Sequence, residues 1–122
     1  DGENISLEMP YVNLISQRDA IDRALRGLEL ISNPATILNV CGPITSVREL
    51  CTKLGEHMGR APNFADDEVD TALLANDDFC TSKFGPYRDG VDDMLQAAAE
   101  WVKAGGEDWN LPTMFGKATH EY

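Results

Sequence analysis

Three stretches of the chain place apolar residues at the spacing of an amphipathic helix. They cover residues 19–30, 47–58 and 90–104, and in each the apolar positions recur every three or four residues. Because an α-helix turns once in about 3.6 residues, this spacing gathers them on one face, which we expect to be buried. The residues expected on these faces are, helix by helix, Ile21, Ala24, Leu25 and Leu28; Val47, Leu50, Cys51, Leu54 and Met58; and Val91, Met94, Leu95, Ala98, Trp101 and Val102.

The second of these helices has the clearest boundaries. Ser46 and Glu49 have the spacing of a capping box, in which the hydroxyl and the carboxylate each satisfy a backbone amide at the helix start. Gly59 predicts the end of the helix, because glycine readily adopts the left-handed conformation that closes many helices. A shorter helix is predicted over residues 73–84, ending at Gly85.

Short strands are predicted at residues 11–15 and 37–41, with a short extended piece at 63–65. Two strands alone make a marginal sheet in water, so we expect the remaining strands to come from the rest of a larger protein. The pattern predicts an α/β fold, as a small mixed and mainly helical lobe with a few short strands. Residues 1–122 are expected to form a single domain.

Composition narrows the class of partner and the compartment. The net charge of −11 repels phosphodiester backbones and anionic lipid, so neither nucleic acid nor a membrane surface is an expected partner. Three cysteines, Cys41, Cys51 and Cys80, are odd in number, lack metal-ligand spacing and sit among apolar neighbours. Buried thiols in a reducing, cytoplasmic compartment explain them better than disulfides. The start at Asp1, without Met, leads us to expect a fragment of a longer protein.

Four stretches of the chain carry a family resemblance in order, namely residues 12–21, 38–50, 59–62 and 73–102. Together they resemble the C-terminal lobe of the extended short-chain dehydrogenases, the NAD(P)-dependent epimerase/dehydratase family. The first resembles the strand leading into the family's Val-x-Asp-Asp-x-Ala helix start, with Asp19 at the recurrent aspartate, and the second resembles its Tyr-Asn-x-Gly-x and Ser-x-x-Glu-Leu segment. The third resembles its Gly-Lys/Arg-x-Pro ending, and the fourth its Asp-x-Ser-Lys helix, Leu-Gly turn and closing helix. The tail at 111–117 also resembles one found in uncharacterised epimerase-like proteins.

The resemblance implies a lobe that has no catalytic role alone. The family's catalytic Tyr-x-x-x-Lys pair does not occur, since Tyr11 is followed four residues later by Ile15 and Tyr87 by Val91. The Gly-rich turn that admits a dinucleotide pyrophosphate is also missing from the chain. The resemblance therefore implies an N-terminal Rossmann domain as partner, with NAD or NADP bound in that parent protein and no cofactor in this chain.

The expected ligand is a small molecule other than a nucleotide-diphosphate sugar. Members of the family that bind such sugars hold the diphosphate with two arginines, and this sequence has Val12 and the acidic run 66–68 at those places. Unpaired carboxylates beside a diphosphate would repel it, so a smaller or less charged ligand fits better. The candidate walls of the substrate cleft lie at the start of the chain and in the 64–77 loop. The candidate substrate-binding residues are Val12, Asn13, Gln17, Asn76 and Arg88.

Several single residues have a structural interpretation beside the functional one. Asp19 either orders a substrate loop or caps its helix, and Asn39 either bonds across a lobe interface or satisfies a turn from a buried position. His57 is expected to be exposed, and His120 is too isolated to be a metal ligand. The acidic run 66–70 lacks the spacing of a calcium loop, so a solvated loop is expected.

Two other interpretations of the whole chain stay open at the level of sequence. One is a non-enzymatic binding or regulatory module that keeps the lobe without catalysis. The other is an autonomous small α/β protein unrelated to the family, which rests on periodicity alone. The length of the encoding reading frame separates these from the lobe of an enzyme.

Overall fold

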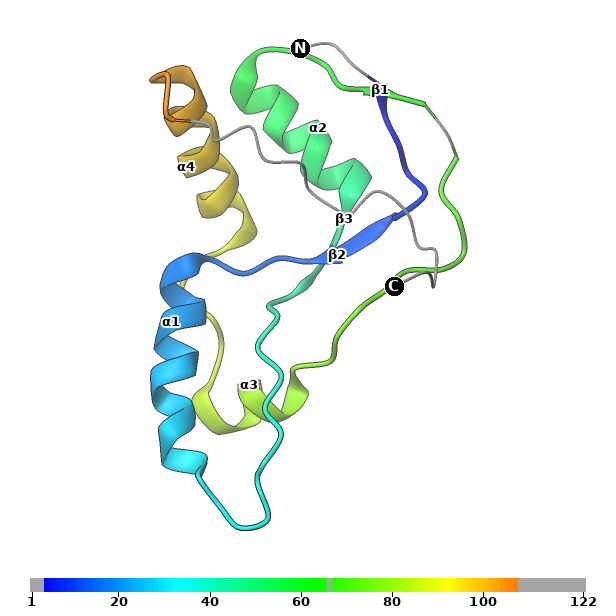
Figure 1. Cartoon of the computed structure of the whole chain (residues 1–122). Helices are drawn as coiled ribbons and strands as arrows, with labels where there is room; N and C mark the ends of the chain where they lie inside the picture. Colours follow the sequence, from blue (N-terminus) through cyan, green and yellow to red (C-terminus); the bar gives the residue numbers. More distant parts are fainter. Residues whose placement is uncertain (1–3, 66, 108–122) are drawn as a thin grey trace.

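The computed structural model describes residues 4–65 and 67–107, which form a small mixed α/β fold (Figure 1). The predicted tail motif at 111–117 and His120 lie outside the described residues. The strands are β1 Asn4–Ile5, β2 Tyr11–Asn13, β3 Ile44–Ser46 and β4 Asn63–Phe64. The helices are α1 Gln17–Arg26, α2 Val47–Met58, α3 Asp78–Phe84 and α4 Val91–Lys103, with a 3₁₀ helix, η1, at Gly27–Leu30. The predicted combination of helices with a few short strands is confirmed at this level.

The strands form two separate two-stranded ladders. β1 pairs in parallel with β4, and β2 pairs antiparallel with β3, so that Val12 lies opposite Thr45. The strand predicted at 11–15 is confirmed over its first three residues, and the extended piece at 63–65 over its first two. The pairing of β1 was not foreseen, because residues 1–10 are mostly polar.

The strand predicted at 37–41 is wrong, because β3 begins only at Ile44. Between the two, Gly42 turns the chain with a φ of 76°, in the left-handed region. The backbone there passes so close to β2 that an added Cβ would lie 2.1 Å from the carbonyl oxygen of Leu14. Residues 37–41 precede this turn, and within the described chain no strand pairs with them.

The helix predictions hold best where a cap defines the boundary. α2 runs over the predicted residues, with the Ser46 hydroxyl accepting a hydrogen bond from the Glu49 amide at 3.3 Å and Gly59 ending it in the left-handed conformation. In a capping box the Glu49 carboxylate would accept from the Ser46 backbone amide. Here it lies 3.3 Å from Lys53 Nζ. α4 also follows its prediction, beginning after Gly90 and ending at Lys103.

Only the second half of the helix predicted at 73–84 forms, as α3. The backbone N–H and carbonyl of Ala75 both bond the side chain of Asn13, so they are committed to β2 and not to a helical turn. Asn76 then precedes the helix, its Oδ1 accepting from the Asp78 amide at 2.8 Å. The predicted end of the helix at Gly85 is confirmed.

Packing divides the helices into two pairs. α2 packs against α4 in the upper half of Figure 1, and α1 packs against α3 in the lower half. Lys53 of α2 lies 2.8 Å from Asp92 of α4, and Lys103 Nζ donates to the carbonyl of His57 at 2.6 Å. The side chain of His57 is exposed, as predicted. The buried apolar residues of the described chain are few: Leu7, Pro10, Cys80, Leu95 and Ala99.

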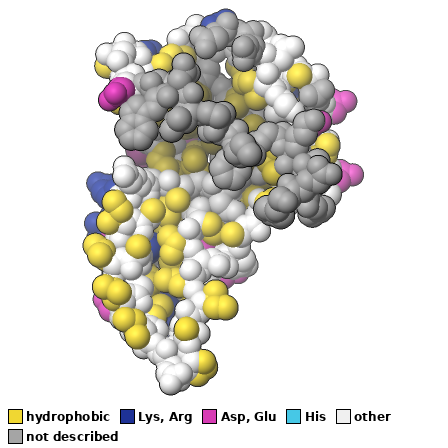
Figure 2. All heavy atoms as spheres, in the orientation of Figure 1, with side chains coloured by type: hydrophobic (Ala, Val, Ile, Leu, Met, Phe, Trp, Pro, Cys, Tyr) yellow, Lys and Arg dark blue, Asp and Glu magenta, His cyan; other side chains and the backbone are white. Residues whose placement is uncertain are grey.

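Helix α1 buries two of its charged residues and leaves most of its apolar residues exposed. Asp19 and Arg23 are 1% and 2% exposed, whereas Ile21 is 52% exposed and Leu25 and Leu28 are each 63% exposed. The prediction that this apolar face is buried is therefore wrong for this chain. Hydrophobic side chains gather over the lower part of Figure 2, where α1 lies. We call Ile21, Ala24, Leu25 and Leu28 the α1 face.

The end of α4 departs from its prediction in the same way. Leu95 is buried, but Trp101 and Val102 are 51% and 54% exposed and Ala98 is exposed. Ala99 is buried instead, because the face that meets α2 is rotated from the one expected. Across the described ranges, no helix combines the length and apolar content needed to cross a membrane.

Candidate functional site

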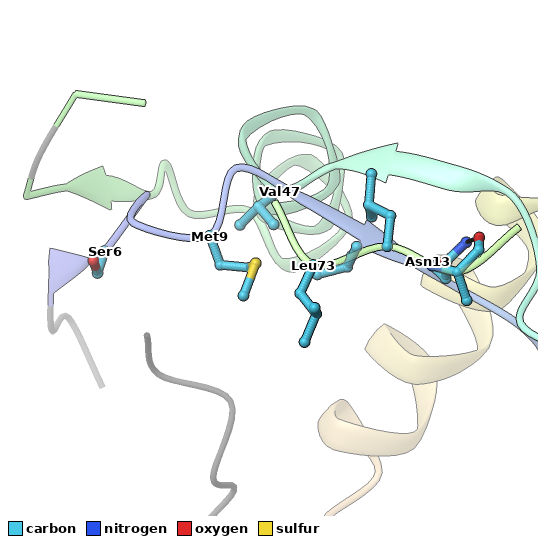
Figure 3. Close-up of a pocket in the computed structure, with 8 residues that line it drawn as sticks. Ser6, Met9, Asn13, Val47 and Leu73 are labelled. Atoms are coloured by element: carbon cyan, nitrogen blue, oxygen red, sulfur yellow. Dashed lines mark hydrogen bonds between the residues drawn. The ribbon is translucent and has the colours of Figure 1, made fainter. Parts of the chain in front are cut away.

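A cleft of about 890 Å³ lies beside β2 and the start of α2. Its walls come from the N-terminal segment, from β2, from the first residue of α2 and from the segment before α3. Figure 3 shows Met9, Val47 and Leu73 between Ser6 at one end and Asn13 at the other. The described lining residues are Ser6, Met9, Val12, Asn13, Val47, Leu73, Leu74 and Ala75.

Asn13 fastens one wall of the cleft to the rest of the fold. Its Nδ2 donates to the carbonyl of Gly42 at 2.9 Å and to that of Ala75 at 3.2 Å. Its Oδ1 accepts from the backbone N–H of Ala75 at 2.9 Å. A single amide side chain thus holds two loops that lie 29 and 62 residues away in sequence.

Two of the five predicted substrate-binding residues line this cleft, namely Val12 and Asn13. Asn76 lines a smaller neighbouring cleft of about 360 Å³, which Asn13 also borders. Gln17 and Arg88 line neither. Gln17 is exposed at the first position of α1, and the exposed Arg88 guanidinium lies 3.5 Å from Asp22.

The side chain of Asn39 is exposed, so the expectation of a buried turn residue is wrong. Its Nδ2 donates to the carbonyl of Asn76 at 2.9 Å, which ties the 37–41 segment to the loop before α3. Cys41 makes a similar link through its thiol, 3.4 Å from the carbonyl of Ala75. These contacts hold the backbone of Ala75, which lines the cleft, and of Asn76 next to it.

A buried polar network on α1 was missed by the sequence analysis. The Asp19 carboxylate accepts from the backbone N–H groups of Arg88 and Asp89 at 2.9 to 3.2 Å. Burial alone raises the pKa of this carboxyl, but the hydrogen bonds from Asp89, Arg88 and Ser16 outweigh it, so that the pKa of Asp19 is lowered. Ser16, not Asp19, caps the helix, so Asp19 anchors a loop instead.

Arg23 holds the same loop from the next turn of α1. Its guanidinium donates to the carbonyls of Phe84, Gly85 and Pro86 at 2.7 to 2.8 Å. It also lies over the ring of Tyr87, 5.1 Å from the centroid. The spacing of Asp19 and Arg23, four residues apart on one face, was visible in the sequence, but charged residues are expected outside.

Tyr87 joins this network to the smaller cleft, which Gly42 and Asp77 border. Its hydroxyl donates to Asp77 and accepts from the Gly42 amide at 3.4 Å. Burial, with the hydrogen bond to Asp77, raises the pKa of Tyr87, so the phenol stays protonated. A neutral phenol whose proton is committed to a carboxylate is suited to fixing a loop, not to moving a proton.

The described cysteines are all free thiols. Cys80 is buried, as expected, whereas Cys41 and Cys51 are half-buried. Burial raises the pKa of the Cys41 and Cys51 thiols, which keeps them protonated and poorly nucleophilic.

The acidic loop offers no metal centre in the part of the chain that the structure describes. No group of three or more His, Cys, Asp or Glu residues is arranged there to hold a metal ion. Glu68 is paired with Arg48, whose Nε lies 2.8 Å from its Oε1. Asp66 is outside the described residues.

The described lining of the cleft is mostly aliphatic, and its polar side chains are the Ser6 hydroxyl and the Asn13 amide. None of the described lining side chains is ionised at neutral pH. Cleft residues are drawn from segments distant in sequence, which Asn13 brings together. No protein family, curated protein or solved structure matches this chain.

Proposed function

We propose that this chain is the substrate-binding C-terminal lobe of an NAD(P)-dependent epimerase/dehydratase-like protein. In that parent, an N-terminal Rossmann domain would bind NAD or NADP and supply the catalytic residues. The lobe itself would be non-catalytic and would shape the substrate cleft. Free thiols at Cys41, Cys51 and Cys80 suit a cytoplasmic parent.

The observation that carries the proposal is the α1 face. A small protein does not gain by burying a carboxylate and a guanidinium while leaving three large aliphatic residues more than half exposed. The arrangement is explained if a second domain covers Ile21, Leu25 and Leu28. Ile31 and Ile37, which are 79% and 85% exposed, flank the same region in sequence.

Two features of the strands also support the presence of a second domain in the parent protein. The described strands form only two-stranded ladders, which are marginal in water without additional strands or packing. The apolar segment 37–41, which resembles a family strand, has no paired strand within the described chain. A neighbouring domain that packs against the 37–41 segment would supply both the missing packing and a partner strand.

The test is association with the domain encoded upstream. The DNA preceding the Asp1 codon in the same reading frame is expressed as a separate chain, and its binding to this chain is measured by isothermal titration calorimetry. We expect it to encode a Gly-rich turn and a Tyr-x-x-x-Lys pair, and to bind. Leu25→Asp should weaken binding by at least about tenfold, since burying a leucine contributes about 1.5–3 kcal/mol.

Val102→Asp is the matched control, because Val102 is 54% exposed on a different helix. It should bind the upstream domain as the unaltered chain does. Equal binding by the Leu25→Asp variant, or an upstream frame without the Gly-rich turn, would reject the proposal.

A non-enzymatic binding or regulatory module is the second candidate. It is favoured by the observation that residues between Ser6 and Ala75 already line a cleft of about 890 Å³ within this chain. An upstream domain that associates but lacks the Tyr-x-x-x-Lys pair would select this candidate over an enzyme.

A further inference from the structure

We infer that the cleft beside β2 binds an uncharged small molecule with an apolar body. This deepens the proposed function, on which it rests, because it gives the substrate class of the same cleft. It is argued from the lining, from the polar atoms left over for a ligand, and from the charge around the cleft.

The lining is predominantly aliphatic. Met9, Val12, Val47, Leu73 and Leu74 all line the cleft. Figure 3 shows Met9 and Val47 beside Leu73. Leu73 and Leu74 are 62% and 38% exposed, so an apolar ligand would remove them from water. The volume of about 890 Å³ falls in the range of about 300–1,000 Å³ that is usual for small-molecule sites.

Asn13 has little left to offer a ligand. A side-chain amide has two N–H donors and one carbonyl oxygen with two lone pairs. Both donors are committed to Gly42 and Ala75, and one lone pair accepts from Ala75. Ser6 Oγ accepts from the Glu8 amide at 3.3 Å, which leaves its O–H to donate. The described side chains of the cleft therefore offer a ligand one acceptor on Asn13 and the hydroxyl of Ser6, and no extended polar surface.

Charge disfavours an ionic ligand. No described lining side chain carries a charge, so an ion would lose its hydration without a partner. The neighbouring smaller cleft is bordered by Asp77 and Asp78, and the chain has a net charge of −11, so anions are repelled further. Arg48, close in sequence to Val47, is already paired with Glu68.

The test measures binding of the uncharged dye Nile red to the complete 122-residue chain, followed by competition. Three competitors are compared: 1-decanol, decanoate with the same alkyl body, and UDP-glucose. We expect 1-decanol to displace the dye at a concentration at least about tenfold lower than decanoate, and UDP-glucose not to displace it. Decanoate or UDP-glucose competing better than 1-decanol would overturn the inference.

Two variants locate the binding. Val47→Asp puts a carboxylate into the wall at the first residue of α2, where an acidic side chain favours the helix start, and should weaken dye binding by about tenfold or more. Leu25→Asp, on the α1 face, should leave it unchanged. Loss in the Leu25 variant and not in the Val47 variant would place the dye on the α1 face and overturn the inference.

The result of the dye-binding test is independent of the association experiment with the upstream domain. A chain that binds 1-decanol but does not bind the upstream domain rejects the lobe and keeps the ligand class. A chain that binds the upstream domain but prefers UDP-glucose keeps the lobe and rejects the ligand class.

Discussion

At the scale of single residues, Asp19 and Arg23 hold in place the loop at residues 84–89, which is far from them in sequence. Each buried charge meets backbone groups of the 84–89 segment, more than 60 residues away in sequence. The hydrogen bonds compensate the desolvation of the charged groups, which would otherwise be prohibitive. The same two residues force the apolar side of α1 outward, so the loop and the α1 face have one cause.

Asp19→Asn should lower the free energy of unfolding at pH 7 by about 1–3 kcal/mol, because buried amide donors lose their charged acceptor. The pKa of Asp19 is lowered in the folded state, so its contribution is present above its unfolded value of about 3.8 and is lost as pH falls through the folded pKa. Urea denaturation from pH 7 to pH 2 should therefore show a smaller acid loss in the variant.

Asp70→Asn is the control, because Asp70 is an exposed carboxylate in the loop before α3. It should change neither the stability at pH 7 nor the acid dependence by more than the measurement error. An Asp19→Asn variant that matches this control would show that the loop is held by other contacts.

At the scale of elements, predictability follows the range of the interactions that define each one. α2 was predicted at both ends because Ser46 and Gly59 lie next to the boundaries they set. α3 was predicted too long, because Asn13, 62 residues away, binds the Ala75 backbone. The strand at 37–41 failed because a strand needs a paired neighbour, which no local pattern supplies. Of the candidate residues named through the family resemblance, Val12 and Asn13 line the cleft, and Gln17, Asn76 and Arg88 do not.

Ser46→Ala tests the cap that defines α2. The hydroxyl accepts from the Glu49 amide, so its loss should lower the free energy of unfolding by about 1 kcal/mol in urea denaturation. Thr52→Ala is the matched control: its hydroxyl donates to the Arg48 carbonyl within the same helix, and alanine there should be neutral or slightly stabilising. Equal destabilisation by both variants would contradict a specific capping role.

At the scale of the whole molecule, the chain combines a high negative charge with the exposed α1 face. A net charge of −11 disfavours self-association, while Ile21, Leu25 and Leu28 are each more than half exposed. The cleft, by contrast, lies beside β2 and the start of α2. The proposed ligand binding and the proposed partner docking thus involve different surfaces, which is why the Leu25 and Val47 variants separate them.

We predict that the isolated chain does not bind a nicotinamide cofactor. Its sequence has no Gly-rich strand-to-helix turn to admit a pyrophosphate, and its charge repels one. Titration with NADH and with NADPH, followed by cofactor fluorescence, should show no saturable change up to millimolar concentration. The upstream domain that the proposed function requires, expressed separately, is the positive control and should bind one of the two. Micromolar binding by this chain alone would contradict the proposal that it is a lobe that depends on another domain for its cofactor.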